Sequence, residues 1–229
     1  MRSSKRKQTV TPLHKHMLYT IGITGGIGSG KSFICHQLEE AGFKVFYCDD
    51  EAKRIMRTNS RLKDILTSVV GNGLYDENGE LNKEVMSAFL RRGKQEADLV
   101  NALIHPLVGA SWLRLKTDWL LKACCAEGSA TRLSSTHPHR QISLERLLSL
   151  PPAHTLVMEC ALLFESDFCN LVDHSVLVHV SQQTQLNRLM ARNHISEEQA
   201  QTWIDLQMSE EERMKRADFI LDNEQDRNK

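Results

Sequence analysis

Residues 25–32 read Gly-Gly-Ile-Gly-Ser-Gly-Lys-Ser and match the pattern G-x-x-x-x-G-K-[ST] of a phosphate-binding loop. Glycines let the backbone curl so that successive N–H groups point toward phosphate oxygens, and the helix that follows adds its own free N–H groups. In such a loop Lys31 supplies a charge for the β- and γ-phosphates, and the Ser32 hydroxyl supplies a ligand for Mg²⁺. The stretch therefore predicts a site for a nucleoside triphosphate.

The residues around this loop alternate between strand and helix patterns. A β-rich run over 18–24 comes before it, and a helical pattern begins at Lys31 and ends at Gly42. A second short apolar run covers 44–48. We expect a βαβ unit with two parallel strands.

The rest of the chain predicts an α/β fold. Residues from 50 to about 123 read as amphipathic helices and form an inserted helical domain. Breaks in this helical pattern are expected at 71–73, 76–79 and 105–106. Further runs of buried-strand length lie at 155–160, 175–180 and 219–221. Strands that alternate with helices favour a mainly parallel sheet of about five strands flanked by helices.

Polar helices are expected between the last two strands. Residues 182–192 carry apolar side chains at helical spacing. Ser196-x-x-Gln199 and Ser209-x-x-Glu212 have the form of capping boxes, which start helices.

Two further stretches look peripheral. Residues 126–152 are rich in loop chemistry and predict a surface excursion with one short helix over 142–150. Residues 1–16 are basic and indicate a disordered tail, with a mitochondrial-type presequence as the alternative.

The amino-acid composition argues against some classes of protein. Of the 229 residues, 29 are Lys or Arg and 29 are Asp or Glu, so the formal net charge is zero. This balance argues against a general nucleic-acid binder, and no apolar run approaches the roughly 20 residues of a membrane-spanning helix. We expect a cytoplasmic protein without nucleic-acid or membrane partners, either a monomer or a small homo-oligomer.

Among proteins with such a loop, the small-molecule kinases fit best. A GTPase would need N-K-x-D, whereas residues 82–85 read Asn-Lys-Glu-Val. Kinases carry an acid near the end of the second strand, and Asp49 is the first acid after 44–48. Its carboxylate can accept the proton of an acceptor hydroxyl, orient that hydroxyl or bind Mg²⁺ through water. The alternative is that Asp49 or Asp50 caps a helix.

Six motifs, in order and spacing, resemble the dephospho-CoA kinase family. They are 23–32 around the loop, Gly42-x-x-Val45-x-x-x-Asp49, His105-Pro106, Leu162-Leu163-Phe164-Glu165, Gln185-Leu186-x-Arg188-x-x-x-Arg192, and Ala217-Asp218-Phe219-Ile220-x-Asp222-Asn223. The resemblance implies that ATP phosphorylates the ribose 3′-hydroxyl of dephospho-CoA, giving CoA and ADP in the last step of CoA synthesis. ATP is then the co-substrate and Mg²⁺ the cofactor.

The same resemblance implies a division of the chain. It comprises a nucleotide-binding core of 17–50 and 153–229, a helical CoA-side domain of 51–123, a surface insertion of 124–152 and a lid of 182–214 within the core.

It also implies roles for particular residues. Asp49 matches the catalytic aspartate, Arg188 and Arg192 match basic residues of the lid, and His105 matches a substrate-side position. The ATP-binding set is Gly26, Gly28, Ser29, Gly30, Lys31, Ser32 and the N–H of Phe33.

The chain departs from the family pattern at three positions. Tyr47 stands where an acid usually precedes the catalytic aspartate by two residues, so Glu159 is a candidate to assist with Mg²⁺. Ala161 replaces a usual proline, and Phe33 replaces a usual threonine. Two other functions stay open: a kinase for nucleosides or nucleoside monophosphates, and an ATP-gated binding module without turnover.

Overall fold

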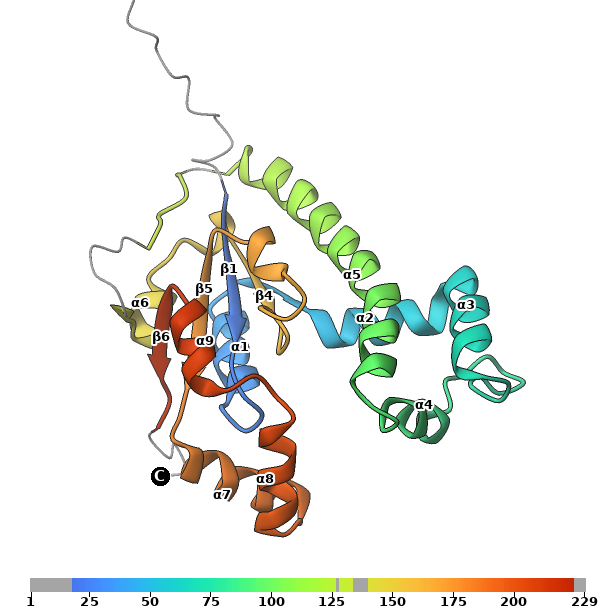
Figure 1. Cartoon of the computed structure of the whole chain (residues 1–229). Coiled ribbons are helices and arrows are strands. Elements are labelled where there is room, and N and C mark those ends of the chain that lie inside the picture. Colours follow the sequence, from blue (N-terminus) through green and yellow to red (C-terminus); the bar gives the residue numbers. More distant parts are fainter. Residues whose placement is uncertain (1–17, 127, 134–139, 225–229) are drawn as a thin grey trace, which may run out of the picture.

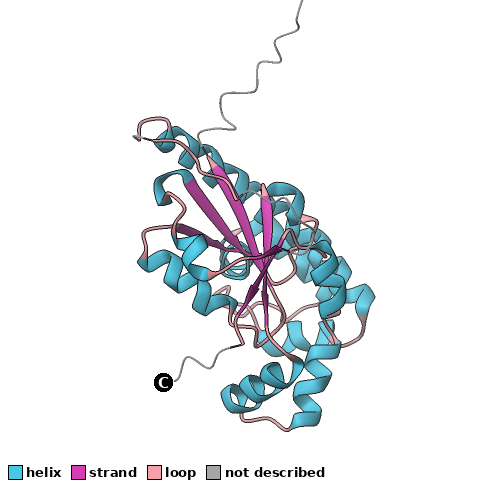
Figure 2. Ribbon diagram, turned by 90° about the vertical axis from the view of Figure 1, so that its left-hand side faces the viewer, coloured by secondary structure: helices cyan, strands magenta, loops and turns pink. Residues whose placement is uncertain are grey.

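A computed structural model describes residues 18–126, 128–133 and 140–224 of the chain. At its centre is a parallel sheet with helices on both sides (Figure 2). The strands are β1 (Tyr19–Thr24), β2 (Lys44–Tyr47), β3 (Arg140–Gln141), β4 (Thr155–Glu159), β5 (His174–His179) and β6 (Phe219–Asp222). Their order across the sheet is β2-β4-β1-β5-β6-β3. The five predicted strands are confirmed, and the two-residue β3 adds a sixth at the edge.

Most of the helices lie between β2 and β4 in the sequence or near the C-terminus. They are α1 (Lys31–Glu40), α2 (Cys48–Thr58), α3 (Ser60–Val70), α4 (Lys83–Leu90), α5 (Lys94–Ala123), α6 (Leu144–Leu148), α7 (Gln182–Asn193), α8 (Glu197–Asp205) and α9 (Glu210–Arg216). Short 3-10 helices cover Pro152–His154 (η2) and Phe168–Leu171 (η3). In Figure 1, α3 and α4 lie to one side of the sheet, whereas α7 and α8 lie beyond the carboxyl ends of its strands. The inserted helical domain is therefore present.

Two apolar clusters bury the two faces of the sheet. Along β4, Leu156 and Met158 belong to the first cluster, and Val157 belongs to the second. The first continues into α2–α5, where the fully buried Trp112 donates from Nε1 to the carbonyl of Leu171 at 3.1 Å. The second lies against α1 and α6. Burial of alternate side chains on both faces explains why β4 reads as a nearly continuous apolar run.

Polar side chains start several helices as the sequence predicts. Ser196 accepts from the N–H of Gln199, whose side chain accepts from the N–H of Ser196, so this capping box is confirmed. Ser209 caps α9 in the same way, but the Glu212 carboxylate pairs with Arg216 at 2.7 Å. Each such cap satisfies an N–H group that the helix itself leaves free.

The predicted helix break at His105-Pro106 is wrong. Helix α5 continues from Lys94 to Ala123 with Pro106 inside it. Proline lacks an N–H, so the bond to the carbonyl four residues earlier is lost. Packing of one side of the helix holds it together, through the buried side chains of Val100, Ile104, Val108 and Trp112.

The predicted surface insertion over 124–152 is wrong for much of its length. It supplies β3 and α6, and the second cluster contains its side chains Leu133, Ile142, Leu144, Leu147 and Leu150. The spacing of these apolar residues turns one side of α6 toward α1. The short helix predicted within 142–150 is present. The basic tail of 1–16 lies outside the described residues.

Candidate active site

The phosphate-binding loop joins the end of β1 to the start of α1. Gly25, Gly28 and Gly30 have φ of 154°, 80° and 92°, a region that favours glycine. The turn closes through a bond of 3.1 Å from the N–H of Ser29 to the carbonyl of Gly26. Because α1 begins at Lys31, its free N–H groups face the concave side of a curled loop.

Lys31 lies against this loop. Its Nζ donates to the carbonyls of Gly25 at 2.7 Å and Gly26 at 3.2 Å. Burial lowers the pKa of Lys31, while the charges of Glu159 and Asp49 act in the opposite direction. The predicted lysine is thus placed at the loop together with two carboxylates. Ser32 and Phe33 occupy the exposed first turn of α1.

Asp49 lies in the first turn of α2. Tyr47 occupies the N-cap position without a capping side-chain bond, so capping by Asp49 or Asp50 is not what the structure shows. The buried Glu159 ends β4, whose residues pair in register with β2. Burial raises the pKa of Glu159, repulsion from Asp49 raises it further, and Lys31 lowers it. The carboxyl ends of β2 and β4 therefore gather two acids and Lys31 at one edge of the loop.

An apolar cavity of about 260 Å³ opens beside Asp49. Its lining combines side chains of α2, α4, α5 and the segment after β4, including Asp49, Met56, Leu90, His105, Cys160 and Phe168. The ring of His105 lies 5.6 Å from the ring of Phe168, and burial lowers the pKa of His105. A neutral imidazole is therefore favoured at pH 7. The structure brings Asp49 and His105 to one cavity, as their assignment to an acceptor requires.

The two lid arginines have different surroundings. Arg188 donates to the carbonyl of Ser29 at 3.3 Å and to the carbonyl of Asn223 at 3.0 Å. Arg192 is exposed, and its Nε donates to the side chain of Asn193 at 3.0 Å. The structure thus brings Arg188 to the loop, whereas the bond of Arg192 is to its neighbour in the sequence.

Three side chains at the loop were not found by sequence reasoning. The Gln207 side chain accepts from the N–H of Ile27 at 2.8 Å, and Arg213 donates to the same oxygen at 3.3 Å. The Asn223 amide donates to the carbonyl of Ser29 at 2.9 Å. Asn223 ends the motif at 217–223 that resembles the family, but that motif gave no indication of a contact with the loop. Arg213 lies in a run of charges that reads as a solvated helix face.

Tyr47 and Ala161, two positions at which the chain departs from the family pattern, each form a hydrogen bond with a neighbouring segment. The hydroxyl of Tyr47 donates to Glu39 at 2.8 Å, at the edge of the sheet. The carbonyl of Ala161 accepts from the Thr24 hydroxyl at 3.4 Å, which ties the segment after β4 to the start of the loop.

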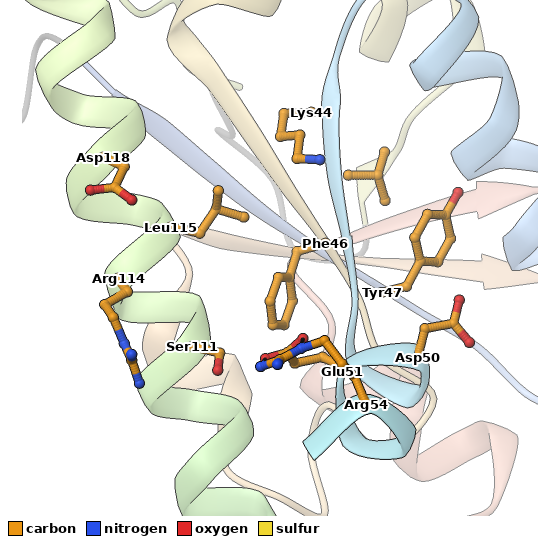
Figure 3. A pocket seen from close by; sticks show the side chains of 11 residues that line it. Lys44, Phe46, Tyr47, Asp50, Glu51, Arg54, Ser111, Arg114, Leu115 and Asp118 are labelled. Atoms are coloured by element: carbon orange, nitrogen blue, oxygen red, sulfur yellow. Dashed lines mark hydrogen bonds and ion pairs between the residues drawn. The ribbon is translucent and has the colours of Figure 1, made fainter. Parts of the chain in front are cut away.

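A larger groove of about 510 Å³ lies between β2, α2 and α5 (Figure 3). Asp50, Glu51 and Arg54 line it from α2, and Arg54 makes two bonds of 2.7 Å to Glu51. Neither Asp49 nor a residue of the phosphate-binding loop lines this groove. We therefore assign the acceptor to the smaller cavity.

A parallel sheet with a phosphate-binding loop after β1, an acid after β2 and an adjoining acceptor cavity defines a P-loop kinase. A family model described as dephospho-CoA kinase matches residues 19–121 and 130–228. The chain belongs to the dephospho-CoA kinase family, whose members use ATP to phosphorylate dephospho-CoA in the last step of CoA biosynthesis. The stretch between the two matched parts, 122–129, is shorter than the predicted insertion of 124–152.

Individual relatives agree with this assignment. Dephospho-CoA kinase of Geobacillus kaustophilus is 32% identical over 207 residues, which are 90% of this chain and 89% of that protein. The crystal structure of TT1252 from Thermus thermophilus superposes with a TM-score of 0.64 at 25% identity, covering 91% of this chain and 90% of the other. Dephospho-CoA kinase from Campylobacter jejuni has a TM-score of 0.50 at 19% identity, covering 92% and 90%, and supports the fold.

Among the residues described, no helix combines the length and hydropathy that crossing a bilayer requires.

Proposed function

We propose that Lys31 holds the phosphates of ATP in the loop while Asp49 faces the ribose 3′-hydroxyl of dephospho-CoA. The position of Asp49 carries this proposal. Its side chain lines the apolar cavity, and its charge acts on Lys31. A residue between donor loop and acceptor cavity is where a phosphoryl-transfer enzyme needs a base.

The transfer is an in-line displacement without a covalent enzyme intermediate. The 3′-oxygen forms a bond to the γ-phosphorus as its proton passes to Asp49. The bond between the γ-phosphorus and the bridging oxygen breaks, and its electron pair leaves on ADP. Lys31 and Arg188 stabilise the negative charge of the phosphates, since positioning and charge neutralisation supply most of the catalysis in this chemistry.

Mg²⁺ belongs to the same proposal. The Ser32 hydroxyl and the carboxylates of Asp49 and Glu159 are hard oxygen donors, which suit this ion. Mg²⁺ usually keeps several waters and takes one or two carboxylates together with substrate phosphates, so this small donor set fits. When bound, the ion would neutralise phosphate charge.

The helices around the cavity form the CoA side of the enzyme, and α7–α9 form the lid over the nucleotide. The contacts of Gln207 and Arg188 with the loop support this role for the lid. His105 contacts the acceptor as a neutral imidazole. A cytoplasmic location and a monomeric or small oligomeric state complete the proposal.

ADP release by the purified protein with Mg-ATP tests these roles. Dephospho-CoA should stimulate release with CoA formed in equal amount, and adenosine and AMP should not. Stimulation by AMP alone would indicate a different acceptor in the same cavity. ATP binding without stimulation by any acceptor would indicate a binding module.

A further inference from the structure

Arg213 of α9 is a buried cation whose partners satisfy only part of its guanidinium. Its side chain is 5% exposed. One terminal nitrogen donates to Glu210 at 3.2 Å, and the other donates to Gln207 at 3.3 Å. The Nε of Arg213 has no hydrogen-bond partner among the described residues. An unpaired buried donor on a charged group is costly, so this position indicates a missing anionic partner.

This cation faces the phosphate-binding loop. A terminal nitrogen of Arg213 lies 3.1 Å from the point where a Cβ on Gly26 would stand. The charge of Arg213 lowers the pKa of Lys31, which places the two cations within electrostatic reach of one another. Arg213 also lines a cavity of about 340 Å³ together with His179, Gln185 and residues of the α8–α9 junction.

The nearby acidic side chains neutralise the positive charge of Arg213 only in part. Glu210 is shared between Arg213 and His179, whose Nδ1 lies 2.8 Å from the carboxylate. Glu159 and Asp49 act on Lys31 from the other side of the loop. The buried Arg213 and the partly buried Lys31 repel each other unless an anion lies between them, and the loop is built to hold phosphates.

We propose that Arg213 contacts the phosphate chain of ATP and is a second cationic catalytic residue beside Lys31, held in place by Gln207. This inference rests on the loop being the ATP site. Arginine stays protonated and presents a planar set of donors, so it stabilises phosphate charge as the bond to the leaving ADP breaks and transfers no proton. Gln207 acts as a positioning residue, because one oxygen accepts from both Arg213 and the N–H of Ile27.

The competing explanation is that Arg213 only cross-links α9 through Glu210. Two matched variants separate these roles. Glu210→Gln removes the charge of the cross-link but keeps an acceptor oxygen for Arg213. Arg216→Gln removes an exposed arginine three residues along the same helix, which pairs with Glu212 on the surface.

The experiment measures the dissociation constant of ATP by calorimetry, kcat with dephospho-CoA, and the ATP-induced rise in Tm. Arg213→Gln should lower kcat about 10²- to 10³-fold, the usual effect of removing a donor to developing charge, and should reduce the ATP-induced rise in Tm. Arg213→Lys should give an intermediate kcat and carries the test if Arg213→Gln does not fold. Glu210→Gln should lower Tm with kcat within a few-fold of the wild type, and Arg216→Gln should change neither.

The proposal is overturned if folded Arg213→Gln or Arg213→Lys keeps the wild-type kcat and ATP affinity. It is also overturned if the Arg213 and Glu210 variants lose activity and Tm in parallel. Failure of the wild type to release ADP with any acceptor would instead refute the catalytic proposal above. In that case the ATP titrations alone decide whether Arg213 contacts the nucleotide.

Discussion

Asp49 and Asp50 are neighbours in sequence, but they line different cavities on either side of α2. Asp50 is exposed and pairs with Lys53 at 3.0 Å, and it lies by the larger groove in Figure 3. We predict that Asp49→Asn keeps ATP binding and lowers kcat about 10²- to 10⁴-fold, because the amide cannot accept the proton of the acceptor. Asp50→Asn is the matched control and should retain turnover. Near-full activity of Asp49→Asn in the ADP-release assay would remove Asp49 from its proposed role.

Gly30 and Gly73 have nearly the same positive φ, 92° and 91°, in different surroundings. A Cβ on Gly30 would overlap the Asn223 amide, whereas nothing lies within 4 Å of a Cβ on Gly73. Each alanine variant should lose about 1 kcal/mol of stability from the left-handed conformation. Gly30→Ala should also displace Asn223 and abolish ATP binding. Equal ATP affinity of the two variants, measured by calorimetry, would contradict this.

The arginines show which contacts of a single residue can be predicted from the sequence and which cannot. Arg188 and Arg192 share one motif and were both expected at the lid, yet Arg188 bonds to the loop whereas Arg192 bonds to its neighbour Asn193. Arg213 belongs to no motif, and its burial depends on how α9 packs against the loop. Spacing along a helix predicts which residues share a face, and tertiary packing decides what that face meets.

At the scale of the element, the side chain of Glu224, which follows β6, forms hydrogen bonds with residues at the start of α7. Its carboxylate accepts from the hydroxyl of Thr184, from the N–H of Ser181 at 2.6 Å and from the Ser181 hydroxyl at 2.7 Å, and these bonds lower the pKa of Glu224 to about 2. The folded state therefore binds fewer protons than the unfolded state between the ordinary pKa of 4.5 and about 2. The stabilisation is present above pH 4.5 and is lost as the pH falls through 2.

Glu224→Gln should consequently lower Tm at pH 6, and this difference from the wild type should shrink as the pH is lowered toward 3. Thermal unfolding followed by circular dichroism at several pH values measures it. Glu212→Gln, on the exposed surface of α9, is the control and should show a smaller difference at pH 6. A deficit in Glu224→Gln that stays constant with pH would assign its effect to something other than ionisation.

Elements differ in how far their sequence predicts them. The strands were predicted closely, because runs such as 155–160 are mostly apolar and this one follows the loop residues Pro151-Pro152. The break at Pro106 was not borne out, since a local rule about proline could not include the packing of Trp112 and its neighbours. The two-residue β3 carries too short a pattern to identify, and pairing with β6 defines it as a strand.

At the scale of the whole molecule, bound ATP should stabilise the fold in proportion to its affinity. At a concentration one hundred times the dissociation constant, the gain in unfolding free energy is about 2.7 kcal/mol. Lys31→Ala should lose most of this gain, because the cation at the loop is removed. The free protein should change little, since burial already disfavours the charged form of Lys31. Denaturant unfolding with and without Mg-ATP measures both quantities, and an undiminished gain in Lys31→Ala would contradict the role of Lys31.

The part of the site that lies at the carboxyl ends of the strands could be predicted, because the topology of the sheet fixes it. Carboxyl ends of parallel strands meet at one edge of the sheet, so the loop after β1, Asp49 after β2 and Glu159 at the end of β4 were expected together. Which helices close around Asp49 was beyond sequence reasoning, because residues 51–123 carry only amphipathic patterns.

Helices α7 and α8 are built around an apolar cluster of their own, with Leu186, Leu189 and Ala200 as its buried members. Partly buried side chains pack against this cluster, and Ile27 of the phosphate-binding loop is one of them. A unit with so small a core opens at a lower free energy than the sheet does. Its backbone amides should therefore exchange with deuterated solvent long before those of β1 and β4, and bound ATP should slow that exchange because Ile27 couples the nucleotide loop to this cluster.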